Sequence, residues 1–101
     1  LLGHLAIGAE MVQRRIDALP EFPEALRLQV LHCVWSHHGE LVNGSPVVPK
    51  TLEALVLYHI DNLDAQADAF LRIMDETREK GQAWSEYIQM IERQIWTKER
   101  I

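Results

Sequence analysis

The sequence predicts an all-α fold, a helical bundle of about four main helices. Three observations support this class. Apolar residues recur at steps of three and four along most of the chain, the alternation typical of strands is not found, and turn-forming residues concentrate between residues 39 and 50. A chain of 101 residues is also the size of one compact domain.

The first two helices are predicted over residues 2–19 and from Pro23 to just past the histidine pair at 37 and 38. Pro20 cannot continue the first helix, whereas Pro23, followed by the acidic Glu24, suits a first helical turn. Gly39 is a natural left-handed terminator for the second helix. The apolar face of the first helix comprises Leu2, Leu5, Ala9, Val12, Ile16 and Leu19.

Residues 39–50 predict a loop, because they hold two Gly, two Pro, an Asn and a Ser without a sustained period. Thr51 can cap a third helix that runs to about Lys80. A fourth helix of about a dozen residues is expected after Gly81 from the spacing of four apolar residues. The third helix carries a long apolar stripe of Leu52, Leu55, Val56, His59, Leu63, Ala67, Phe70 and Met74, and the fourth carries Trp84, Ile88, Ile91 and Ile95.

Charge and cysteine content exclude several classes of protein. The formal net charge is −5, so the chain does not bind nucleic acid through its overall electrostatic field, and any polyanion must be held locally. The single cysteine, Cys33, excludes a disulfide framework and a thiolate zinc site, and it is compatible with a cytoplasmic location. No apolar run approaches the roughly 20 residues of a membrane span.

The adjacent His37 and His38 are the first candidates for metal ligation. Neighbours on a helix point about 100° apart, so this pair is not expected to chelate one ion side by side. At the last helical turn the two could serve two nearby ions, or one could be a ligand while the other packs. Packing against the core remains the alternative for each histidine, because imidazoles are often half-buried and bonded to a carbonyl.

Other polar residues have two interpretations each. Asp61 lies on an apolar face of the third helix, where a carboxylate is unfavourable unless it is paired or metal-bound, although a solvated acidic edge is the alternative. Lys50 precedes the capped helix start and is a candidate contact for substrate phosphate, or else a solvated loop lysine. We expect His32 and His59 to be structural and Cys33 to be a small buried hydrophobe. The three tryptophans, at 35, 84 and 96, are too far apart in sequence to indicate a base-stacking platform.

Four short motifs resemble a known family. They are LLGH at 1–4, SHHGE at 36–40, PKTLEAL at 49–55 and YHIDNLDA at 58–65. In this order they resemble the second half of an HD-domain metal-dependent phosphohydrolase, and most closely the YhaM-type 3′-to-5′ exoribonucleases. The resemblance covers most of residues 1–80.

The resemblance implies that His4, His37, His38 and Asp61 coordinate divalent metal. It also implies that residues 1–101 are the C-terminal part of the domain, since the upstream His, the His-Asp dyad and the N-terminal OB-fold of these proteins are not in the sequence. We therefore expect an incomplete metal shell, no catalysis by this part alone, and a longer full-length protein.

Imidazole and carboxylate ligands suit Mn, Fe, Co, Ni or Zn, and acidification should weaken binding because each imidazole must be neutral. Two ions about 3.5–4 Å apart would activate a water and hold phosphoryl oxygens. On three neutral imidazoles and one carboxylate they would leave a local charge of about +3, enough to hold RNA or nucleotide phosphate despite the acidic surface.

The expected function is metal-dependent phosphohydrolysis, of the 3′-to-5′ exoribonuclease type in the full-length protein. One alternative is a nucleotide or cyclic-dinucleotide phosphohydrolase on the same scaffold. Another is a non-catalytic helical interaction module whose histidines merely pack. A homodimer is expected in either class, because a domain divided through its core exposes apolar surface that association tends to cover.

Overall fold

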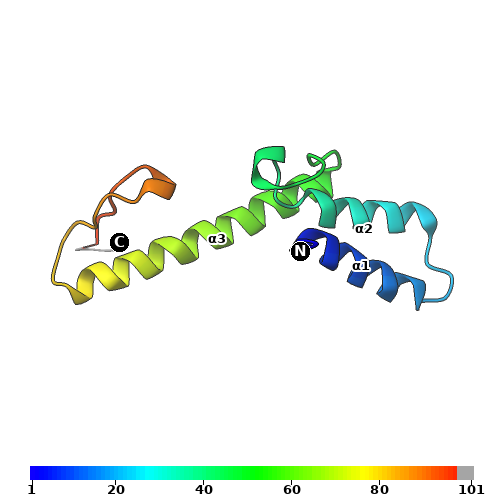
Figure 1. Cartoon of the computed structure of the whole chain (residues 1–101), viewed down its shortest axis with the longest axis horizontal. Coiled ribbons are helices and arrows are strands. Elements are labelled where there is room, and N and C mark those ends of the chain that lie inside the picture. The colour runs from blue at the N-terminus through cyan, green and yellow to red at the C-terminus, as the bar shows by residue number, and fades with distance from the viewer. Residues whose placement is uncertain (98–101) are drawn as a thin grey trace. The chain divides into compact units, whose positions relative to one another are not determined.

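The computed structural model describes residues 1–97, and this part of the chain is all-α, as predicted. The described residues form the α-helices α1 (His4–Asp17), α2 (Glu24–Ser36) and α3 (Leu52–Glu79), which are labelled in Figure 1. They also form the 3₁₀ turns η1 (Leu41–Asn43) and η2 (Gln89–Ile91). Residues 1–97 contain no strand beyond isolated β-bridges. Within the same residues, every helix is too short or too polar to span a lipid bilayer.

The chain divides into two compact units where one was expected. The first is Leu1–Asn62 and the second is Leu63–Ile101, so the boundary falls inside α3. The first unit contains all the residues predicted to hold metal or phosphate, and it is the unit that determines the site.

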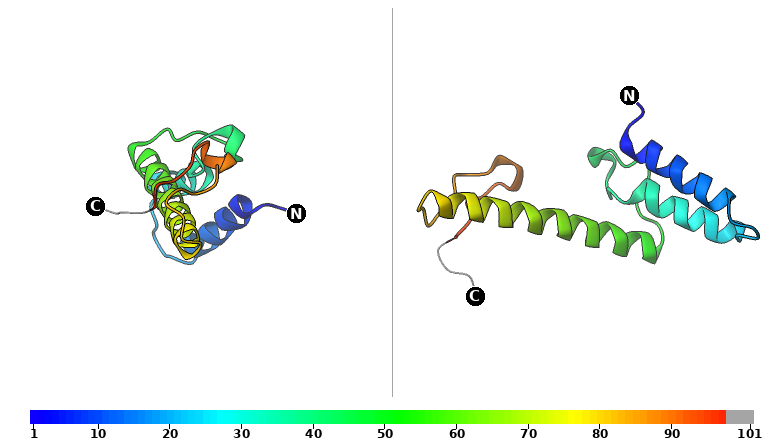
Figure 2. Two further views of the ribbon diagram at one scale, coloured as in Figure 1. Left: turned by 90° about the vertical axis from the view of Figure 1, so that its left-hand side faces the viewer. Right: turned by 90° about the horizontal axis from the view of Figure 1, so that it is seen from below.

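Helices α1 and α2 form the packed pair of the first unit. They lie side by side in Figures 1 and 2, with the start of α1 beside the end of α2. Ala9 and Ile16, both on the predicted apolar face, are buried. Gly8 faces Val34 across the pair, since a Cβ built there would make an ordinary contact with Cγ1 of Val34 at 3.9 Å. The pairing places the beginning of α1 next to the histidine pair that follows α2.

The loop between α2 and α3 is held to α2 by hydrogen bonds to Trp35 and His32. The hydroxyl of Ser45, only 2% exposed, lies 2.8 Å from the carbonyl oxygen of Trp35 and can donate to it. The backbone N–H of Lys50 donates to Nε2 of His32 at 2.9 Å, which gives His32 the structural role predicted for it. Oγ1 of Thr51 accepts the N–H of Ala54 at 3.2 Å, so Thr51 caps α3 as predicted.

The apolar stripe predicted on α3 is exposed over the first half of the helix, so it does not face a core there. Leu52 and Leu63 are 71% and 69% exposed, His59 is also exposed, and Ala54 is buried. The reason is that the first turns of α3 do not pack along α1 or α2. Periodicity therefore identified the helix but not a partner for it.

The predicted fourth helix is wrong. The chain after α3 folds back beside the last turns of that helix, as both figures show, and the bridges Trp84–Trp96 and Ile88–Arg93 join its two arms. Residues four apart share a face in an extended chain as well as in a helix. The 84–88 and 91–95 spacings therefore do not discriminate between a helix and an extended chain. The step of three between 88 and 91 falls at the turn, where η2 lies.

Folding back also brings two distant tryptophans together. The ring centroids of Trp84 and Trp96 lie 5.0 Å apart, with the rings inclined at 62°. This edge-to-face arrangement is favourable for aromatic pairs. Sequence separation was therefore a poor guide to how the tryptophans are placed.

Ser85 is expected to hold this folded-back segment in place. Its hydroxyl, on a residue 3% exposed, accepts the N–H of the buried Ile95 at 2.8 Å. Ser85→Ala should leave that donor without its partner and destabilise the segment by about 1–3 kcal/mol. Hydrogen exchange at the Ile95 amide should become faster by the corresponding factor, and unchanged protection would contradict this assignment.

Candidate metal centre

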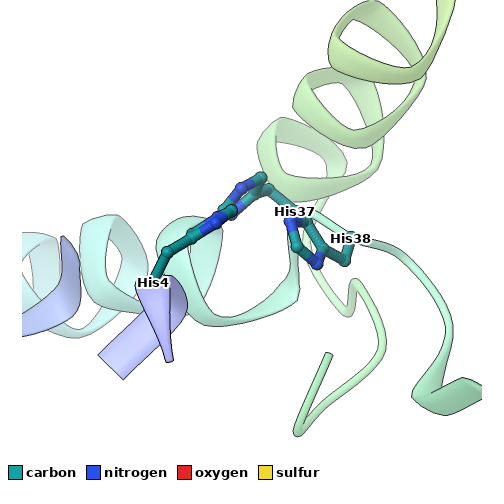
Figure 3. A group of neighbouring side chains, drawn as sticks. All are labelled: His4, His37 and His38. Atoms are coloured by element: carbon teal, nitrogen blue, oxygen red, sulfur yellow. The ribbon is translucent and has the colours of Figure 1, made fainter. Parts of the chain in front are cut away.

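Three histidines from the first unit converge at the end of the α1–α2 pair. Figure 3 shows the rings of His4, His37 and His38 turned toward one another, and their nearest ligand nitrogens all lie within 4.8 Å. His4 is the first residue of α1, and His37 and His38 directly follow α2. His4 is exposed and the other two are partly buried, so the cluster is open to solvent on one side.

The geometry of the pair differs from the helical expectation. The ring centroids of His37 and His38 are 4.6 Å apart, and that of His4 lies 4.9 Å from His38 and 5.9 Å from His37. The difference arises because α2 ends at Ser36, so His38 does not continue the helical rotation. Both rings therefore face the start of α1.

Backbone carbonyls fix the ring orientation of both histidines of the pair. Nδ1 of His37 lies 2.6 Å from the carbonyl oxygen of Val34, and Nδ1 of His38 lies 3.1 Å from that of Asn43. A carbonyl only accepts hydrogen bonds, so each Nδ1 carries the proton and, in the neutral ring, Nε2 keeps its lone pair. Metal-binding histidines in proteins typically make this second bond.

Gly39 shapes the turn that presents the pair. Its φ is +82°, in the left-handed region, and its N–H donates to the carbonyl oxygen of Ser36 at 2.9 Å. The ring of Tyr58, from α3, covers the position that a Cβ would occupy. Glycine is thus required here both for backbone conformation and for space, and the contact ties α3 to the histidine turn.

Asp61, also predicted to be a ligand, is not brought into the cluster, and Lys50, the predicted phosphate contact, lies on the loop before α3. Asp61 is exposed on α3, and its carboxylate is not among the ligand atoms that gather with the three imidazoles. It does share a face of α3 with Tyr58, three residues earlier. The side chain of Lys50 is exposed, and the one contact described for this residue is the backbone bond to His32.

Cys33 does not join the cluster and is poorly suited to nucleophilic chemistry. Burial raises the pKa of its thiol, and the nearby Glu53 carboxylate raises this pKa further. The thiolate fraction at neutral pH is therefore lowered. We expect the pH–rate profile for alkylation of Cys33 to be shifted to higher pH in the folded protein than in the urea-unfolded chain. Coincident profiles would contradict this.

The donor set fits a borderline divalent ion. Three imidazole nitrogens suit Mn, Fe, Co, Ni or Zn better than Ca, which prefers oxygen ligands. The sequence identified the three histidines but not what orients them, since backbone carbonyls leave no side-chain signal. No family model matches the chain, and no solved structure matches it. The site is therefore characterised by its own geometry.

Proposed function

We propose that His4, His37 and His38 are ligands of a divalent metal centre, and that the chain is the C-terminal part of an HD-type metal-dependent phosphohydrolase. The observation that supports this most is the convergence of three imidazoles, two of which, His37 and His38, keep their Nε2 lone pairs available through Nδ1 bonds to carbonyls. Packing histidines have no need to meet at one solvent-facing point.

Asp61 is proposed as a further ligand of the same centre. Tyr58 touches the turn after His38, and Asp61 follows Tyr58 by about one helical turn on the same face of α3. A carboxylate beside three neutral imidazoles would strengthen the attraction for a divalent cation. Residues upstream of Leu1 in a longer protein would supply the remaining ligands.

The chemistry proposed is phosphodiester hydrolysis. When bound, divalent ions would supply an activated water and hold the phosphoryl oxygens during in-line attack. Carbonyl bonds orient the ligand nitrogens of His37 and His38, and the exposed Lys50 contacts substrate phosphate. Because the net charge is −5, phosphate must be held locally at this centre and not by the general surface.

The substrate proposed for the full-length, cytoplasmic protein is RNA, degraded from its 3′ end. The test is a substrate panel with that protein and Mn²⁺: single-stranded RNA, single-stranded DNA, cyclic dinucleotides and mononucleotides. Shortening of RNA from the 3′ end, lost on His38→Ala, supports the proposal. Preferential hydrolysis of cyclic dinucleotides or mononucleotides would replace it with the alternative phosphohydrolase. Cleavage that survives His38→Ala would contradict a role for this centre.

The second candidate function is a helical interaction module. It is favoured by the exposed apolar residues at the start of α3, where Leu52, Val56 and Ile60 are 71%, 47% and 59% exposed. This candidate, like the first, predicts a homodimer. Light scattering of the chain at high concentration should give twice the monomer mass of 11.7 kDa, and a clean monomer would count against association.

A further inference from the structure

We infer that the cavity beside His4 and His38 binds a planar ring carried by the phosphoryl substrate, such as a nucleobase, and that Trp35 is the surface against which this ring stacks. The inference rests on the proposed function, because the phosphoryl group is taken to sit at the histidine centre. It adds a binding site for the part of the substrate next to the phosphate.

The cavity adjoins the candidate metal centre directly. Its volume is about 330 Å³, at the small end of the range of ligand pockets, and both His4 and His38 line it. Its other walls are mostly apolar and include Leu5, Trp35 and Pro46. A group attached to a phosphate held at the histidines would therefore lie against this apolar wall.

A second cavity, of about 340 Å³, lies next to the first along the α1–α2 pair. Trp35 and Ala6 line both cavities, so Trp35 forms part of the wall of each. The second cavity is more polar, with Gln13 and Arg14 among its lining residues. The path leading away from the histidines is thus apolar at first and polar further on.

This order of surfaces fits a heterocycle better than an alkyl chain. The faces of a heterocycle stack on an indole, while its polar edge can use amides such as those of Asn43, which lines the first cavity, and Gln13 in the second. An alkyl chain would leave these polar groups without new partners. The backbone of Trp35 is also held before binding, because its carbonyl oxygen is 2.8 Å from the buried Ser45 hydroxyl.

The experiment is calorimetry of the full chain with Mn²⁺, followed by titration of the Mn²⁺-loaded chain with adenosine 5′-monophosphate, ribose 5-phosphate and inorganic phosphate. We expect the nucleotide to bind at least about tenfold more tightly than ribose 5-phosphate, the gain typical of one stacked base. Trp35→Leu should abolish this preference without changing the affinity for Mn²⁺ or ribose 5-phosphate. Trp96→Leu, a matched change in the other unit, should change none of the three.

A second variant keeps the inference testable if Trp35→Leu fails to fold. Ala6→Leu preserves the Trp35 indole, is favourable in a helix and fills space in both cavities. It should therefore also lower the affinity for the nucleotide to that for ribose 5-phosphate. Equal affinities in the parent chain, or a preference that survives both substitutions, would overturn the inference alone. Absence of Mn²⁺ binding would overturn the proposed metal centre, and this inference with it.

Discussion

Replacing His37 and His38 together by Ala is expected to weaken Mn²⁺ and Zn²⁺ binding by about 100-fold or more. The two substitutions remove two of the three clustered imidazoles, and changes to groups that merely orient ligands already reduce metal affinity by about 10- to 100-fold. Isothermal titration and the metal content of the purified protein both measure this effect.

His59→Ala is the matched control for that experiment. His59 is also an imidazole of the first unit, but it is exposed on α3 and its described ring contact is with Tyr58. Its removal should leave the metal affinity unchanged. If the double variant retained the metal content of the parent chain, the histidines of the cluster would be packing residues and the phosphohydrolase proposal would fail.

Gly39→Ala is expected to have the largest effect on stability, about 2–5 kcal/mol. An alanine at φ +82° adopts a conformation that costs about 1–2 kcal/mol, and its Cβ would displace the Tyr58 ring, for about 1–3 kcal/mol more. Urea denaturation followed by circular dichroism measures the loss. Metal affinity should fall as well, because Gly39 directly follows the histidine pair.

Gly44→Ala separates the two contributions. Gly44 has a φ of +87°, but a Cβ built there meets nothing within 4 Å. This substitution should therefore lower the stability only through the unfavourable backbone conformation. The difference between the two variants then measures the contact with Tyr58. Equal losses of stability would show that the Tyr58 ring moves away without cost and that α3 does not hold the histidine turn.

The sequence predicted those parts of the fold that depend on single residues and their nearest neighbours along the chain. Proline, glycine and a capping threonine lie at the ends of α1, α2 and α3, and these residues act through their own backbone conformation or nearest neighbours. The segment after α3 was predicted wrongly because the spacing of its apolar residues fits a folded-back chain equally well. The exposure of the α3 stripe was also missed, since a pattern specifies a face but not what covers it.

The site was predicted in part for similar reasons. Residue type and order identified the three histidines, and the structure brings them together from the start of α1 and the turn after α2. It does not bring Asp61 to them, because the first turns of α3 do not pack along α1 or α2. The carbonyls of Val34 and Asn43, which set the ring orientations, are backbone groups that any residue would supply. The role proposed for Trp35 depends on the walls of two cavities, which only the folded chain defines.

The most direct measurement of the metal centre is anomalous X-ray diffraction from crystals of the chain grown with Zn²⁺. An anomalous peak bonded to Nε2 of His37 or His38, and within ligand distance of His4, is the predicted result. A peak held elsewhere by exposed carboxylates, with the three imidazoles unliganded, would contradict the account.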